Sequence, residues 1–227
     1  MLEIFKTELH CHSTEVSACS KITATQLRDR YISAGYTTVV LTNHFAVFTY
    51  NHLKCADWQE FVDKYMYGYN LLKSVSQGQL EILLAIEIRP QDSPNDYLMY
   101  GVTEGFLREN EFLYNKSVEK LSRLARENGI LFIQAHPFRD YMQMTSTELI
   151  DGIEVFNGNH GGHYGTDSRN DIAEAYADKY EFIKTSGTDL HYPNDKILGG
   201  IATNEKIRSI PQLIEILKSG NYKLIKD

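Results

Sequence analysis

Residues 116–137 read KSVEKLSRLARENGILFIQAHP, a helical pattern that runs into a buried strand and then a histidine. The amphipathic part, 116–129, closes on Gly129, as helices often do. ILFIQA at 130–135 is a short apolar run, the pattern of a strand that is buried on both faces. His136 follows that strand directly. The stretch therefore predicts one unit of a parallel sheet covered by helices, with a histidine at the carboxyl end of its strand.

The same alternation of patterns continues along the rest of the chain. The expected strands are 2–9, 37–42, 80–88, 96–102, 130–135, 152–156 and 182–186, and the YKLI tail closes the chain. The expected helices are 23–35, 57–76, 116–129, 167–180 and 210–219. No repeat or Pro/Gly/Ser-rich linker divides the sequence. About seven strands in one domain, 1–227, favour an α/β barrel with its active site at the carboxyl ends of the strands.

The helical segment 57–76 is rich in aromatic residues near helical spacing: Trp58, Phe61, Tyr65 and Tyr69. An aromatic stripe of this kind can form a base-stacking surface or pack on a core. We expect these side chains to pack against the barrel, because their spacing places them on one face of the helix.

Composition excludes several classes of protein. The net charge of −7 argues against a surface that coats long DNA or RNA, which is normally basic. No apolar run approaches the roughly 20 residues of a membrane span, and the amino terminus lacks the pattern of a signal peptide. Three cysteines with no zinc-finger spacing do not suggest a disulfide framework. We therefore expect a soluble cytoplasmic protein with no membrane or long nucleic-acid partner.

Histidine and acidic residues gather where the expected strands stop. HCH at 10–12 and DLH at 189–191 each place two such residues at i and i+2, which point to the same face of a strand. Glu87 ends an otherwise apolar strand, where a lone buried carboxylate is costly unless it is paired or bound to metal. Imidazole and carboxylate ligands suit Zn²⁺, Mn²⁺ or Fe²⁺. The candidate metal ligands are His10, His12, His44, Glu87, His136, Asp189 and His191.

The order of these motifs resembles the PHP (polymerase and histidinol phosphatase) family, from residue 8 to about residue 200. The resemblance implies a distorted (β/α)7 barrel that holds two or three divalent metal ions. It implies a first ion on His10, His12 and Asp189, and a second on His136, with Glu87 bridging the two. His44 and His191 would hold a third ion or complete the cluster.

Three departures from the family pattern bear on the second and third ions. Asn43 precedes His44 where relatives carry an acidic residue. The acidic residue or histidine that usually follows HxH is absent, which leaves Glu15 or Cys19; Cys19 is either a soft ligand or a small packing residue. The histidine that several phosphatases carry after the glutamate strand is also absent, and Asp96 is either its substitute or a turn residue.

Other polar residues near these motifs have competing roles. Glu154, beside Asn157, can orient a metal ligand. Arg139 can bind a phosphate with its planar guanidinium or form a surface salt bridge, and Arg89 can point the same way as Glu87. Two loop histidines, His160 and His163, either face a substrate from a lid or are simply solvated.

These residues predict a metal-dependent hydrolase. We expect a phosphomonoesterase that acts on a small phosphorylated metabolite through a metal-activated hydroxide, with Asp189, Glu87 and Arg139 in catalytic roles. No GxSxG motif supplies a serine nucleophile. The alternatives are a phosphodiesterase acting on a nucleotide or dinucleotide, and a non-catalytic metal-binding regulatory module. The sequence does not specify the metal, the substrate or the oligomeric state.

Overall fold

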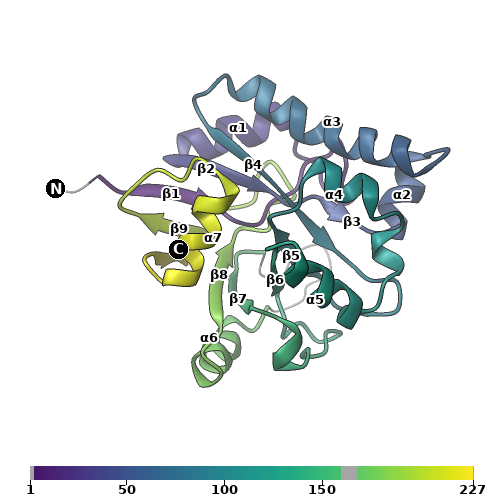
Figure 1. Cartoon of the computed structure of the whole chain (residues 1–227). Helices are drawn as coiled ribbons and strands as arrows, with labels where there is room; N and C mark the ends of the chain where they lie inside the picture. The colour runs from purple at the N-terminus through teal and green to yellow at the C-terminus, as the bar shows by residue number, and fades with distance from the viewer. Residues whose placement is uncertain (1–2, 160–167, 227) are drawn as a thin grey trace.

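Strands and helices alternate along most of the chain (Figure 1). The structure, a computed structural model, describes residues 3–159 and 168–226. Its strands are β1 (Phe5–Glu8), β2 (Tyr36–Leu41), β3 (His44–Phe45), β4 (Glu81–Ile88), β5 (Tyr97–Tyr100), β6 (Leu131–Gln134), β7 (Gly152–Asn157), β8 (Ile183–Gly187), β9 (Gly200–Thr203) and β10 (Lys223–Ile225). Its α-helices are α1 (Ala24–Ser33), α2 (Val47–Leu53), α3 (Trp58–Ser76), α4 (Glu104–Glu109), α5 (Val118–Glu127), α6 (Asn170–Lys179) and α7 (Ile210–Ser219).

The strands form one curved sheet that nearly closes into a barrel. Their order is β10-β9-β1-β2-β4-β5-β6-β7-β8, with β3 beside β4. The pairs β1/β2, β2/β4, β6/β7 and β7/β8 are parallel. Helices α1 and α3 cover one side of the sheet, and α4, α5 and α6 lie around the remainder (Figure 1). The predicted α/β barrel is confirmed.

Some strands depart from the expected parallel arrangement. β5 runs antiparallel to both β4 and β6, and β9 runs antiparallel to β1 and β10. The connection from Ile88 to Tyr97 is too short for the crossover helix that a parallel pair needs. The expectation of parallel strands throughout is therefore wrong at β5, and β9 was not among the expected strands.

Alternation along the strands fills the barrel with apolar side chains. In β4, Leu83 and Ala85 join the interior cluster together with Leu98, Ile133 and Ile201 from other strands. Helix α7 contributes Leu213, Ile216 and Leu217 to the same cluster. Because side chains two apart share a face, the next inward position of β4 after Leu83 and Ala85 is Glu87. The barrel interior therefore passes from apolar layers to a buried carboxylate at the end of β4.

The outer face of the sheet packs against the helices. Trp58, Phe61 and Tyr65 of α3 are buried in the cluster between the helices and the sheet, and Tyr69 packs against it. These contacts confirm that the aromatic stripe of 57–76 is core. None of the described helices has both the length and the apolar character needed to cross a membrane.

Candidate metal centre

The carboxyl ends of β1, β4, β6 and β8 bring the predicted ligands to one place. His10 and His12 follow β1, Glu87 lies near the end of β4, His136 follows β6, and Asp189 follows β8. All seven predicted ligands fall into overlapping groups of three, in which the ligand atoms lie within 4.8 Å of one another. The groups are His10, His12 and Asp189; His10, Glu87 and His136; His12, His44 and His191; and His44, Glu87 and Asp96, of which Asp96 is not one of the seven. The expected sets for the first, second and third ions are therefore each assembled in space.

Glu87 lies at the centre of these groups. Its Oε1 is 3.3 Å from His10 Nε2 and 3.1 Å from His136 Nε2. Its Oε2 is 3.4 Å from His12 Nε2 and 2.7 Å from His44 Nδ1. The side chain of Glu87 is fully buried. One buried carboxylate therefore lies within 3.4 Å of a nitrogen of each of four imidazoles, an arrangement that fits the predicted bridging role.

The HCH and DLH segments lie against each other as an extension of the sheet. Cys11 forms a parallel bridge with Leu190, and the Asp189 amide donates to the His10 carbonyl at 2.7 Å. This pairing places Asp189 Oδ1 3.5 Å from His10 Nε2 and 3.1 Å from His12 Nε2. The two Nε2 atoms are themselves 3.2 Å apart.

These spacings fit divalent metal ions. Two ligands at about 2.0 to 2.1 Å from one tetrahedral zinc ion are about 3.3 Å apart. Several buried atoms also have no hydrogen-bond partner among the described residues: Glu87 Oε2, His44 Nδ1 and His136 Nδ1. His44 Nδ1 and Glu87 Oε2 are close but out of line for a hydrogen bond. Buried polar atoms are normally satisfied, so the donor set and its unpaired atoms fit a bound cation.

The electrostatics of the cluster favour the ligand forms of Glu87, Asp189 and His12. Burial alone would raise the pKa of Glu87, but His44 and His10 lower it well below its ordinary value. The pKa of Asp189 is also lowered against the effect of burial, by His10 and His191. Burial, and then the like charges of His191 and His44, lower the pKa of His12. Ionised carboxylates and a neutral imidazole are the forms that bind metal. Burial lowers the pKa of His10, His44 and His191, but the neighbouring carboxylates raise it above the ordinary value, so a bound ion would have to displace a proton from these three imidazoles.

Two of these residues have a strained backbone. Asp189 has φ 53° and His136 has φ 29°, in the left-handed region that residues other than glycine rarely adopt. Such strain concentrates at functional sites, where the surrounding structure holds it. Each residue lies two positions after the last residue of its strand, Gln134 of β6 or Gly187 of β8.

Glu154 and Asn157 support the ligands from β7. Glu154 Oε1 is 2.9 Å from His10 Nδ1, and its Oε2 accepts from the His136 amide at 3.0 Å. Asn157 Nδ2 donates to Glu154 at 2.9 Å and to Asp189 Oδ2 at 3.2 Å. Glu154 therefore fixes the ring of His10, as a carboxylate behind a metal-binding histidine does.

Arg139 forms an ion pair inside the cluster rather than at the surface. Its Nη2 donates to Asp189 Oδ2 at 2.9 Å and to Asn157 Oδ1 at 3.1 Å. Its Nε is buried and has no partner in the described part of the chain. The guanidinium thus holds one oxygen of Asp189 and keeps a donor free for a further group.

Glu15, Cys19 and Asp96, the residues considered as substitutes for missing family ligands, lie in different parts of the structure. Glu15 accepts from the Ala24 amide at 2.9 Å, near the start of α1. Asp96 pairs with Arg89 and lies 3.9 Å from His136 Nε2. Hydrogen bonds from His191 and His44 lower the pKa of the Cys19 thiol to about 6, although burial opposes the shift. Cys19 and Asp96 thus adjoin the predicted ligands, whereas the contacts of Glu15 lie at the helix.

The Asn43 side chain hydrogen-bonds to the loop that follows HCH. Its Oδ1 accepts from the Ser13 amide at 2.8 Å and from Ser17 Oγ at 2.9 Å. Ser17 Oγ in turn lies 3.3 Å from His12 Nδ1 and accepts from the His44 amide at 3.0 Å. Asn43 therefore acts on the histidines through Ser17.

Sequence reasoning missed Glu8, which lies under the cluster and touches both ligand-bearing segments. Its position two before His10 on the same strand was the available signal. His160 and His163 lie outside the described residues.

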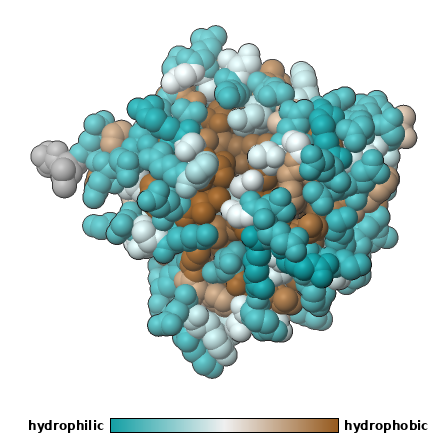
Figure 2. Space-filling view, viewed as in Figure 1, coloured by the Kyte–Doolittle hydropathy of each residue, from teal (hydrophilic) through white to brown (hydrophobic). Residues whose placement is uncertain are grey.

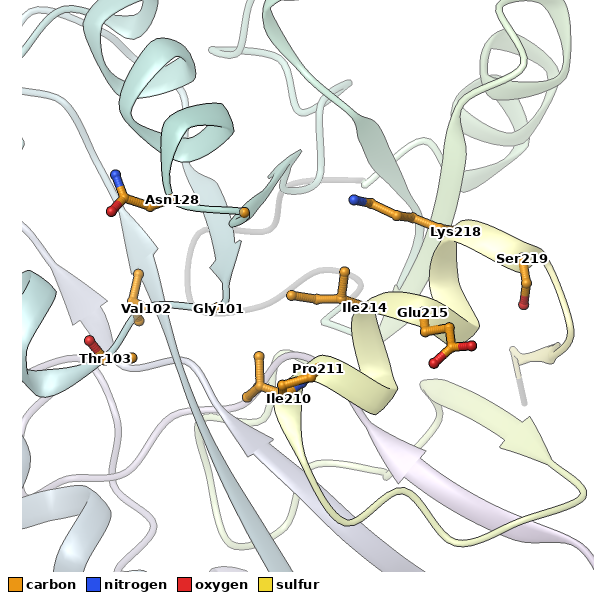
Figure 3. A pocket seen from close by; sticks show the side chains of 11 residues that line it. Gly101, Val102, Thr103, Asn128, Ile210, Pro211, Ile214, Glu215, Lys218 and Ser219 are labelled. Carbon is orange, nitrogen blue, oxygen red and sulfur yellow. The ribbon is translucent and has the colours of Figure 1, made fainter.

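A separate cavity of about 800 Å³ lies beside α7 (Figure 3). Val102, Pro211 and Ile214 provide apolar walls, and Glu215 and Lys218 are the charged lining residues. Figure 2 shows apolar side chains exposed in a hollow in the middle of this face. No predicted site residue lines this cavity, which holds no histidine or cysteine. The cavity is therefore separate from the candidate metal centre.

No protein-family model and no curated protein matches the sequence, but solved structures do. One is a two-domain protein from Bacteroides vulgatus that contains a predicted PHP-like metal-dependent phosphoesterase. Its sequence is 18% identical to this chain and the TM-score is 0.69; the match covers 99% of this chain and 65% of the Bacteroides protein. The chain has the PHP fold. PsfC of Pseudomonas syringae is 14% identical with a TM-score of 0.67 over 93% of this chain and 88% of its own.

The lesion-specific endonuclease EndoQ of Pyrococcus furiosus also has the PHP fold of this chain. It is 17% identical with a TM-score of 0.64, and the match covers 98% of this chain and 58% of EndoQ. The chain thus spans less than two thirds of the Bacteroides protein and of EndoQ. The resemblance noted from the HCH, AHP and DLH motifs is confirmed at the level of the PHP fold.

Proposed function

We propose that the protein is a metal-dependent phosphomonoesterase that acts on a small phosphorylated metabolite. The observation that carries this proposal is Glu87, one buried carboxylate within 3.4 Å of three imidazole Nε2 atoms and 2.7 Å from a fourth imidazole nitrogen. The proposed ions are two or three of Zn²⁺, Mn²⁺ or Fe²⁺, held by the seven predicted ligands. The PHP fold shared with named phosphoesterases supports the same reaction class.

Each residue has a definite task in this proposal. Bound divalent ions would polarise a phosphoryl oxygen and lower the pKa of a water molecule. Glu87 holds the neighbouring ligand sets at a fixed separation. Asp189 presents Oδ1 to the histidines while Arg139 and Asn157 hold its Oδ2. We assign to Arg139, whose Nε has no partner among the described residues, the task of binding a phosphate oxygen and stabilising developing negative charge.

A small substrate is the better proposal than a long nucleic acid. The net charge of −7 disfavours binding along a phosphate backbone. The fold also serves an endonuclease, EndoQ, which keeps a phosphodiester substrate as the second candidate. Bound cations would offset the negative charge of the protein only close to the site. A small ester or a dinucleotide fits within that region, whereas a long nucleic acid would extend beyond it.

The test is a reconstitution of the chelated protein with Zn²⁺, Mn²⁺ or Fe²⁺, followed by a panel of phosphomonoesters, phosphodiesters and short oligonucleotides. We expect release of inorganic phosphate from monoesters in the metal-loaded protein, and its loss in Asp189→Asn. Glu104→Gln, an exposed change on α4, serves as the matched control and should keep wild-type turnover.

Two results would contradict the proposal. If the protein hydrolyses oligonucleotides or phosphodiesters but no phosphomonoester, it is a phosphodiesterase instead. Stoichiometric metal without turnover of any ester in the panel would favour the non-catalytic metal-binding module.

A further inference from the structure

Glu8 is a fully buried carboxylate beneath the metal centre, with hydrogen bonds at both oxygens. Its Oε1 accepts from the backbone amides of Leu9 at 3.0 Å, His10 at 2.9 Å and Thr188 at 2.9 Å. Its Oε2 accepts from Tyr31 Oη at 3.0 Å and from the Thr188 hydroxyl. Burying a carboxylate is costly, so a group with this many directed contacts has a specific task.

The contacts of Glu8 cross the place where β1 meets the chain that follows β8. β8 stands at one end of the strand order, and β1 connects to the other end through β9 and β10. We call this place the seam, defined by Glu8, His10, Thr188 and Asp189. Glu8 and Thr188 are 180 residues apart in the sequence. β1 pairs with β2 along one edge and with β9 along the other, and the chain that follows β1 meets the chain that follows β8 at the Cys11–Leu190 bridge. The Glu8 carboxylate adds a side-chain link to Thr188 just before that bridge.

Two of the three backbone amides that donate to Glu8 Oε1 set the directions of two predicted ligands. One belongs to His10 itself, and the other to Thr188, which immediately precedes Asp189. The His10 carbonyl accepts from the Asp189 amide on the same side of the seam. A single oxygen that accepts from both segments fixes the two peptide planes relative to each other, and with them the separation of His10 and Asp189.

We propose that Glu8 is a positioning residue that clamps the HCH and DLH segments at the separation an ion requires. This inference rests on the proposed function, because it needs the metal centre to exist. Glu8 contacts no proposed ligand atom, so its effect passes through the backbone of His10 and Thr188. The side chain must be long enough to reach the amides of both His10 and Thr188, so its length decides whether the two segments are held together.

Three substitutions separate this role from general stability. Glu8→Gln keeps the length and the oxygen that accepts from the amides, and the hydroxyls of Tyr31 and Thr188 can rotate to accept from its NH₂. Glu8→Asp is one methylene shorter and cannot span the seam. Tyr31→Phe is the matched control, since it removes a hydrogen bond to the same carboxylate from α1 alone.

The measurement is the dissociation constant for Zn²⁺ by chelator competition on the full chain, at a temperature where circular dichroism shows each variant folded. We expect Glu8→Asp to weaken Zn²⁺ binding about 10- to 100-fold, the range for partners outside the ligand shell. Glu8→Gln and Tyr31→Phe should stay within about 3-fold of wild type. Absorption of the Co²⁺-loaded chain should change in Glu8→Asp alone, because the geometry of the ligands changes.

Should Glu8→Asp fail to fold, Thr188→Val provides the second arm, since it removes the hydroxyl contact at the seam with little change in volume. It should also loosen Zn²⁺. If folded Glu8→Asp, or Thr188→Val in its place, has the wild-type dissociation constant for Zn²⁺, the positioning role is overturned and the metal centre stands. A wild-type chain that takes up no Zn²⁺ would overturn both, and Zn²⁺ binding without phosphatase activity would remove only the proposed function.

Discussion

Because Asp189 has a left-handed backbone, two substitutions can distinguish its role as a metal ligand from its effect on stability. Asparagine tolerates the left-handed region better than alanine does, because its short polar side chain bonds locally. We expect both Asp189→Asn and Asp189→Ala to lose metal-dependent turnover. The Asn variant should unfold at a higher temperature, with a free energy of unfolding about 0.5 to 1 kcal/mol above that of Asp189→Ala. Thermal unfolding of the two metal-free variants checks this, and equal stabilities would contradict it.

Asn43 offers a way to strengthen the centre from a distance. Ser17 accepts from His12 and donates to Asn43, so a carboxylate at position 43 would make His12 a more basic ligand through Ser17. Asn43→Asp should therefore tighten the most labile ion, which we expect on His44 and His191 with His12 beside them. Chelator titration of both proteins tests this.

A double variant isolates the path through Ser17. Asn43→Asp combined with Ser17→Ala should show no tightening, because the hydroxyl between the carboxylate and His12 is gone. Tightening that survives the loss of Ser17 would mean that the added charge acts through space.

At the scale of the element, β8 depends on a glycine at its end. A Cβ on Gly187 would lie 2.3 Å from His10 Cβ and 2.7 Å from Glu154 Oε1. Gly187→Ala should therefore displace His10 and weaken both metal binding and stability, as overpacking typically costs about 1 to 3 kcal/mol. Gly105→Ala on α4 is the control, with nothing nearer than 3.8 Å. It should leave metal affinity unchanged and stabilise the helix slightly, and a Gly187→Ala protein with wild-type affinity would contradict the argument.

The elements also show what the sequence could predict. β4 and β6 were predictable because an apolar run of strand length followed by Glu87 or His136 is a local pattern. The direction of β5 was also readable, because the segment between the expected strands 80–88 and 96–102 is too short for the crossover helix of a parallel pair. The task of Glu8 depends on the register between segments 180 residues apart, which no local pattern encodes.

At the scale of the whole molecule, the metal centre should contribute to the stability of the fold. Its seven predicted ligands include buried histidines and carboxylates at the carboxyl ends of β1, β4, β6 and β8. A ligand that binds only the folded state at 100 times its dissociation constant adds about 2.7 kcal/mol. Chelation should thus lower the melting temperature, and excess Zn²⁺ or Mn²⁺ should restore it. Scanning calorimetry with and without chelator measures this, and an unchanged melting temperature would indicate that the ions are not coupled to folding.

The seam has a consequence for the synthesis of the protein. Glu8 and His10 leave the ribosome before Thr188 and Asp189, because Thr188 lies 180 residues after Glu8 in the chain. Until then β1 lacks the segment that closes the barrel, and HCH lacks its carboxylate partner. Domains generally complete their folding as units during translation. The complete ligand set therefore exists only after Asp189 has been made, so an ion bound earlier by His10 and His12 would lack its carboxylate ligand until the seam forms.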